Sequence, residues 1–133
     1  MDVNLKNHEN NSCLLLACHN NPNINIIKYL VEECGMDINS KNYVNYNCLL
    51  LACYKNPNLD IIKYLVEVCK MDINQKYDYS NNFLVFAPSN PNINIIKYLI
   101  EDHELDIDYK NNDINNCLLQ ACYDNQNINI INI

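Results

Sequence analysis

Residues 47–53, Asn-Cys-Leu-Leu-Leu-Ala-Cys, decide the fold of this chain, together with two segments that follow them. The first of these is residues 60–65, Asp-Ile-Ile-Lys-Tyr-Leu, and the second is residues 71–74, Met-Asp-Ile-Asn. Copies of the 47–53 stretch begin at Ser12, Asn82 and Asn116, so that successive copies are offset by 35, 35 and 34 residues. Self-similarity at a fixed period of this size is the signature of a repeat architecture. The chain is therefore built from copies of one unit.

The repeat divides the chain into three full units and a partial fourth within one domain, residues 1–133. The units are residues 1–35, 36–70, 71–104 and 105–133. Each unit alone leaves an apolar face uncovered, so that about three are needed for a stable array. This chain has just enough repeats to be stable as a single domain.

One unit, residues 36–70 and the loop after it, reads as helix, turn, helix and projecting loop. Asn47 can cap a short apolar helix over about residues 48–54, as Ser12 can one unit earlier. The segment Asn56-Pro57-Asn58 ends this helix, because the residue before a proline avoids helical geometry. Asn58 then caps a second helix over about residues 59–69, whose apolar residues share one helical stripe. The sequence therefore predicts an all-α array of stacked units.

These residues resemble the ankyrin repeat over the whole chain. The usual ankyrin unit carries Thr-Pro-Leu-His-Leu-Ala-Ala, then Val-Val-Lys-Leu-Leu-Leu, then Ala-Asp-Val-Asn. In this chain residues 47–53, 61–66 and 71–74 stand at those places. The resemblance implies an ankyrin-type α-solenoid of helix-turn-helix-loop repeats. It also implies a non-enzymatic module that binds a partner protein on the concave face formed by loop tips and first helices.

The chain departs from the usual ankyrin pattern in several places. Its period is longer, with one extra residue between the helices and one after the second helix. The usual His is replaced by Leu15, Leu50, Val85 and Leu119, so the inter-repeat hydrogen bonds of that His are expected to be absent. The usual tip Gly is replaced by Asn10, Asn45, Ser80 and Ile114, of which Asn tolerates the left-handed conformation. This divergence resembles the degenerate ankyrin repeats of large DNA viruses and A/T-rich protists.

Unit three differs most from its neighbours. Phe83, Phe86 and Pro88 replace Cys48, Leu51 and Cys53, and one residue is missing nearby. Because proline cannot continue a helix, we expect the first helix of this unit to end early.

Candidate partner-binding residues lie where the units differ, at the loop tips and at the exits of the first helices. They are His8, His19, Tyr43, Tyr46, Tyr54, Tyr77, Tyr79, Asp113 and Tyr123. Tyrosine suits an interface because it is large, stiff and polar at one end. Free drift of the surface, with tyrosine supplied by codon bias, explains the same pattern equally well. Tyr29, Tyr64 and Tyr98 recur in register and are interpreted as framework.

The composition narrows the classes of function. A net charge of −7 argues against nucleic acid and anionic membranes as partners, because phosphate binding needs clustered Lys and Arg. The chain has no long apolar run, and its start lacks the features of a signal peptide. We therefore expect a cytoplasmic, intracellular protein, in the host cytoplasm if it is viral. The 28 Asn residues are interpreted as the product of A/T-rich codons.

Eight cysteines suggest a metal or redox site, but their spacing follows the repeat and none forms a Cys-x-x-Cys motif. We interpret them as small core residues, with Cys34 and Cys69 the most reactive, and we expect no metal, no cofactor and no catalytic residues. A small Cys-dependent redox or metal protein remains an alternative.

A second alternative is that the chain is a fragment of a longer array without a function of its own. The sequence stops at Ile133, partway through a second helix. Residues 126–133 are therefore expected to fray first, and self-association through this open C-terminal end is possible.

Overall fold

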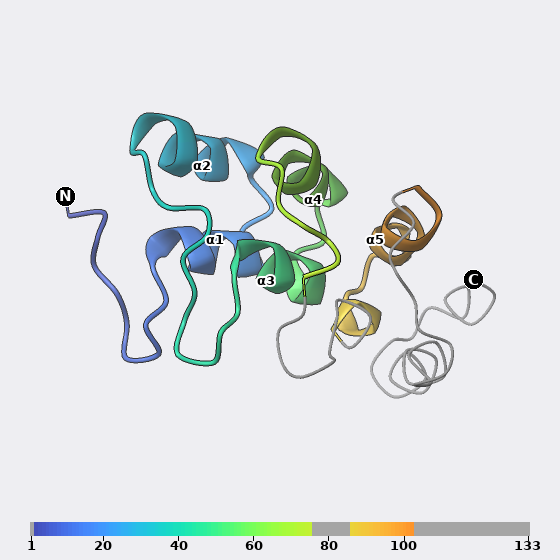
Figure 1. Cartoon of the computed structure of the whole chain (residues 1–133), viewed down its shortest axis with the longest axis horizontal. Coiled ribbons are helices and arrows are strands. Elements are labelled where there is room, and N and C mark those ends of the chain that lie inside the picture. The colour runs from blue at the N-terminus through green and yellow to red at the C-terminus, as the bar shows by residue number, and fades with distance from the viewer. Residues whose placement is uncertain (1, 76–85, 103–133) are drawn as a thin grey trace.

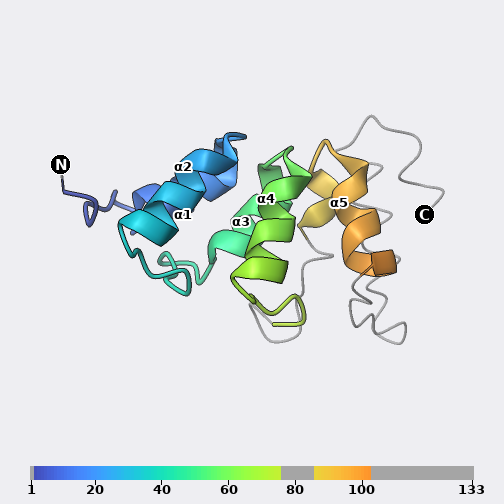
Figure 2. The same ribbon diagram turned by 90° about the horizontal axis from the view of Figure 1, so that it is seen from above.

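The computed structural model describes residues 2–75 and 86–102, which form two parallel rows of short helices (Figure 1). The first row contains α1 (Cys13–Asn20), α3 (Cys48–Lys55) and the 3-10 turn η4 (Ala87–Ser89). The second row contains α2 (Ile24–Lys28), α4 (Leu59–Lys63) and α5 (Ile93–Lys97), which follow one another in order in Figure 2. These three run directly into the π-helical turns η1 (Tyr29–Glu33), η2 (Tyr64–Val68) and η5 (Tyr98–Asp102). The all-α prediction is confirmed for this part of the chain.

Side chains cap the helices at the predicted places. The Ser12 hydroxyl accepts a hydrogen bond from the Leu15 amide at 3.2 Å, and the Asn47 side chain accepts one from the Leu50 amide at 3.0 Å. The Asn58 side chain caps the second helix of its unit in the same way. Such caps satisfy backbone N–H groups that have no partner within the helix. In the described part of the chain, no helix is both long and apolar enough to cross a membrane.

Each second helix ends in a π-helical turn, which the sequence did not predict. The Cys34 amide donates to the Tyr29 carbonyl and the Cys69 amide to the Tyr64 carbonyl, both at 3.0 Å and both spanning five residues. A residue with positive φ follows η1 and η2, Gly35 at 64° and Lys70 at 61°. A π turn holds one residue more than an α turn. The π turn therefore accommodates the extra residue that the sequence places after each second helix.

The core lies between the two rows and between successive units. Leu14, Leu49, Ile62 and Leu65 are fully buried in it, and α1 packs against α3. Burial of such side chains stabilises each by about 1.5–3 kcal/mol. The core is therefore continuous across the units.

The cysteine predictions have mixed outcomes. Cys18, Cys48 and Cys53 are fully buried, as expected of core residues. The sequence did not predict that Cys18 and Cys48 meet across two units, where a hydrogen bond to Cys48 and burial raise the pKa of the Cys18 thiol. Burial also raises the pKa of Cys69, which lowers its thiolate fraction. Cys34 and Cys69 are nevertheless only partly buried, and their reactivity stays a prediction.

Asparagine side chains at the C-terminal ends of α3 and η4 form hydrogen bonds to the preceding unit. Asn56 Nδ2 donates to the carbonyls of Cys18 at 3.0 Å and Asn21 at 2.9 Å. One unit later Asn90 Nδ2 reaches the carbonyls of Cys53 at 3.1 Å and Asn56 at 2.8 Å. The repeats thus have inter-unit hydrogen bonds made by asparagine, a residue for which the sequence did not predict this role.

The loop tips adopt the expected backbone conformation where the structure describes them. Asn10 has φ of 65° and Asn45 has φ of 68°. In unit three, Pro88 lies in a 3-10 turn where units one and two have α-helix. The tips at Ser80 and Ile114, and the predictions for residues 126–133, lie outside the described residues.

Candidate functional site

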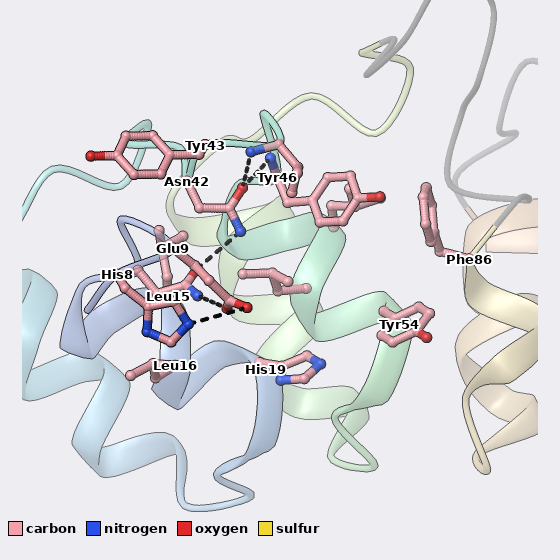
Figure 3. Close-up of a pocket in the computed structure, with 14 residues that line it drawn as sticks. His8, Glu9, Leu15, Leu16, His19, Asn42, Tyr43, Tyr46, Tyr54 and Phe86 are labelled. Atoms are coloured by element: carbon pink, nitrogen blue, oxygen red, sulfur yellow. Dashed lines mark hydrogen bonds and ion pairs between the residues drawn. The ribbon is translucent and has the colours of Figure 1, made fainter. Parts of the chain in front are cut away.

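A pocket of about 490 Å³ opens between two loop tips and the first-helix row (Figure 3). We call it the tip–helix pocket. It is lined by His8, Glu9, Asn11, Leu15, Leu16, His19, Asn42, Tyr43, Val44, Tyr46, Leu50, Leu51, Tyr54 and Phe86. Both tips, α1 and α3 contribute residues, and Phe86 comes from the third unit. The pocket therefore exists only because the units are stacked.

Asparagine side chains brace the two tips that form one side of the pocket. The Asn42 Oδ1 atom accepts hydrogen bonds from the amides of Val44 at 3.1 Å and Tyr46 at 3.0 Å. The tips are also joined directly, because the Tyr43 amide donates to the Glu9 carbonyl at 3.1 Å. This bracing fixes the tip residues at the mouth of the pocket.

Aromatic rings form one wall of the pocket. The Phe86 ring meets Tyr46 edge-on with centroids 5.2 Å apart and Tyr54 edge-on at 5.7 Å. The His19 ring stacks on Tyr54 with centroids 5.9 Å apart. Edge-to-face and offset pairs are the favourable arrangements of aromatic rings. The wall is therefore preorganised, and Leu15 and Leu50 form an apolar floor beside it.

The structure brings five of the nine predicted site residues into this one pocket. They are His8, His19, Tyr43, Tyr46 and Tyr54. Tyr43 is strongly exposed, with 75 % of its surface accessible. The remaining four, Tyr77, Tyr79, Asp113 and Tyr123, lie outside the described residues. The partner-binding role of all nine stays a prediction.

The framework interpretation of the second-helix tyrosines depends on position in the array. Tyr64 and Tyr98 are 6 % and 3 % exposed, as framework residues should be. Tyr29, the equivalent residue of the first unit, is 54 % exposed. Lys28 lies over the Tyr64 ring and Lys63 over the Tyr98 ring, at 5.5 and 5.7 Å from the centroids. Each ring is thus covered by the unit that precedes it.

Sequence reasoning missed several lining residues. Phe86 was noted only as a departure from Leu51, although a bulky ring at a variable first-helix position could have indicated a role in the wall. Glu9 lies between His8 and Asn10 in the first tip, but nothing in the sequence separates it from other exposed acidic residues. Asn42 recurs one unit after Asn7, and the sequence gives no other sign of its role. The position of these side chains depends on how neighbouring units stack, which the repeat pattern does not specify.

Charge is sparse in the tip–helix pocket. Burial, followed by the positive charge of Lys55, lowers the pKa of His19 from its usual value of 6.5. Glu9 is the single carboxylate among the lining residues, and His8 Nε2 lies 4.0 Å from its Oε1 atom. Across the described residues, no group of three His, Cys, Asp or Glu side chains is placed to hold a metal ion. The arrangement is suited to binding an apolar or amphipathic surface.

A protein-family model matches the whole length of this chain. The protein-family model described as "Ankyrin repeats (3 copies)" matches residues 1–77 and 49–133. The comparison with curated proteins finds no significant match.

Among solved structures, the chain is similar to one titled as the predatory endopeptidase Bd0816 from Bdellovibrio bacteriovorus in complex with immunity protein Bd3460. The TM-score is 0.60 at 23 % identity, over 78 % of this chain. The match covers 50 % of the other chain, and at this level of identity it shows a shared fold alone.

Proposed function

The chain belongs to the ankyrin-repeat family, whose members generally mediate protein–protein interactions and are generally not enzymes, and we propose that it binds a partner protein in the tip–helix pocket. The fold is accordingly an ankyrin-type α-solenoid. The partner would lie along the concave face, against the loop tips and the first-helix row. We further propose that the protein works inside cells. Because the chain is acidic, we also propose that its partner is neither nucleic acid nor membrane.

The observation that carries this proposal is the combination of an apolar floor, an aromatic wall and exposed tip side chains in one pocket. Interface hot spots are enriched in tyrosine and are surrounded by residues that exclude water. Tyr43 is exposed at the mouth, Tyr54 lies in the wall, and Leu16 is an exposed apolar residue beside the floor. Large apolar side chains gathered on an exposed surface mark interaction sites.

The experiment is affinity capture from the native host with quantitative mass spectrometry. Tyr43→Ser and Tyr54→Ser should each lose the captured partner, because they remove contacts in the pocket. Tyr29→Ser is the matched control, since Tyr29 is also exposed but lies in the second-helix row, away from the pocket. A partner retained by both pocket variants and lost from the control would place the binding surface elsewhere.

A further inference from the structure

A chain of hydrogen bonds holds the Glu9 carboxylate at the pocket. Asn42 Nδ2 donates to Asn11 Oδ1 at 3.0 Å, and Asn11 Nδ2 donates to Glu9 Oε2 at 3.0 Å (Figure 3). Asn11 and Asn42 are both buried, so the bond between them is protected from water, whereas the Asn11–Glu9 bond is partly buried. This series of hydrogen bonds begins in the second unit and ends in the first. The stacking of two units therefore positions one acidic side chain.

One oxygen of this carboxylate is available to a ligand. Oε2 receives the Asn11 bond, whereas Oε1 points toward His8 Nε2 at 4.0 Å, which is beyond hydrogen-bonding distance. The Glu9 side chain is exposed at the mouth of the pocket. An incoming N–H donor could therefore reach Oε1 without displacing the Asn11 bond.

The pocket carries a negative charge at one end and has a positive charge just outside its other end. Glu9 is the single Asp, Glu, Lys or Arg among the lining residues, and it lies at the tip end. Lys55 lies outside the lining, with Nζ 4.9 Å from the Tyr54 ring at the exit of α3. Desolvation and Lys55 both disfavour protonation of His19, which keeps positive charge away from the wall near neutral pH. A cationic group would thus be favoured at the tip end.

We propose that the tip–helix pocket recognises a protein segment by an arginine or lysine whose charged end pairs with Glu9. This inference rests on the proposed function and names the chemistry of its partner. The aliphatic stem of such a side chain packs on apolar surface while its head stays polar, which fits the apolar lining, where Leu16 is exposed. Aromatic faces also attract cations, and Tyr46 lies in the same pocket. The acidic net charge of the protein would steer a basic segment toward it.

The test is a phage-displayed random peptide library selected against the 133-residue chain. Peptides enriched on the wild type should carry Lys or Arg beside a large apolar residue. Glu9→Gln should weaken these peptides about tenfold, because it removes the charge but retains the shape of the side chain. Glu33→Gln is the control, since Glu33 is an exposed glutamate of η1 outside the pocket, and it should bind them like the wild type. Affinity should also fall as salt is raised.

The outcomes separate this inference from the proposed function. Apolar peptides without a basic residue that are weakened by Tyr54→Ser but not by Glu9→Gln would overturn the basic anchor and leave pocket binding in place. Selected peptides that neither variant weakens, or a selection that enriches none, would count against both. Circular dichroism of each variant should match the wild type, so that a loss of binding is not a loss of fold.

Discussion

At the scale of single residues, asparagine side chains make structural hydrogen bonds that the composition did not predict. Its abundance was interpreted as codon bias, yet in the described residues Asn47 and Asn58 cap helices, Asn42 braces a tip and Asn56 bridges two units. The amide both donates and accepts, so one side chain can satisfy a turn in its own unit and a carbonyl in the next. Codon bias explains the supply of asparagine, and the structure shows where it is used.

Replacing Asn56 by alanine should destabilise the array strongly. Asn56 is fully buried, donates to two carbonyls of the preceding unit and accepts from the Asn58 amide at 3.0 Å. Loss of these bonds should lower the free energy of unfolding by about 2–4 kcal/mol, measured by urea denaturation. Asn21→Ala is the control, because Asn21 makes the same turn bond, to the Asn23 amide, but lies at the first unit. Equal losses in the two variants would show that the inter-unit bonds add little.

His19 should make stability depend on pH. Its pKa in the folded state is lowered below the usual 6.5, so the unfolded chain binds more protons in the window just below that value. Stability is therefore full above pH 6.5 and falls as pH drops through the window. The wild type should lose more stability than His19→Gln between pH 8 and pH 5, as followed by urea midpoints. Parallel curves for the two proteins would mean that His19 is not perturbed.

At the scale of the helix, the π turn explains a difference in repeat length. The described second helices were expected to be regular, but each combines five α-helical residues with a five-residue π turn. The apolar stripe predicted from α-helical spacing still marked buried residues such as Ile62 and Leu65. The stripe did not reveal the turn, although Leu65 lies within η2, because Leu65 is buried there as it would be in a regular α-helix.

Deleting Val68 should be tolerated better than deleting Ile62. Val68 is exposed and lies at the end of η2, so its removal would let the Cys69 amide bond the Tyr64 carbonyl in ordinary α-helical geometry. The expected cost is about 1 kcal/mol or less, typical of surface changes. Loss of Ile62 would rotate every later residue of the helix by about 100° and expose the core. Thermal melts of the two deletions give the comparison, and a Val68 deletion that melts as low as the other would show that the π turn is structurally required.

At the scale of the whole molecule, stacking determines how well each unit is covered. Tyr29, Tyr64 and Tyr98 occupy equivalent places, yet the first is half exposed and the other two are buried. Tyr64 also donates from its hydroxyl to Glu32 Oε1 at 2.8 Å, across the boundary of two units. In repeat arrays stability is approximately a sum of unit terms and nearest-neighbour terms. The second unit, with a neighbour on each side, gains two such terms.

Hydrogen exchange should follow this difference. Amides of α3 and α4 should exchange more slowly than those of α1 and α2, because opening the second unit breaks two boundaries. Mass spectrometry or NMR on the 133-residue chain gives the rates. Equal protection of the two pairs would mean that the array unfolds as one cooperative unit.

The repeat pattern was enough to predict the fold and several local features. The caps at Ser12 and Asn47 and the left-handed tips at Asn10 and Asn45 follow from local chemistry, which a sequence displays directly. The same local pattern indicated which tips and helix exits vary. The positions of Glu9 and Phe86 relative to those residues depend on contacts between units. They became visible only in three dimensions.

The asparagine bridges have a consequence for how such a chain can evolve. Asn56 and Asn90 reach carbonyl oxygens of the preceding unit, and every residue has such an oxygen whatever its side chain. A junction made in this way does not depend on the identity of the residues it joins. Gene duplication or recombination that adds, removes or exchanges a whole unit would therefore preserve the bridge. The tips could then diverge between units without a matching change in their neighbours.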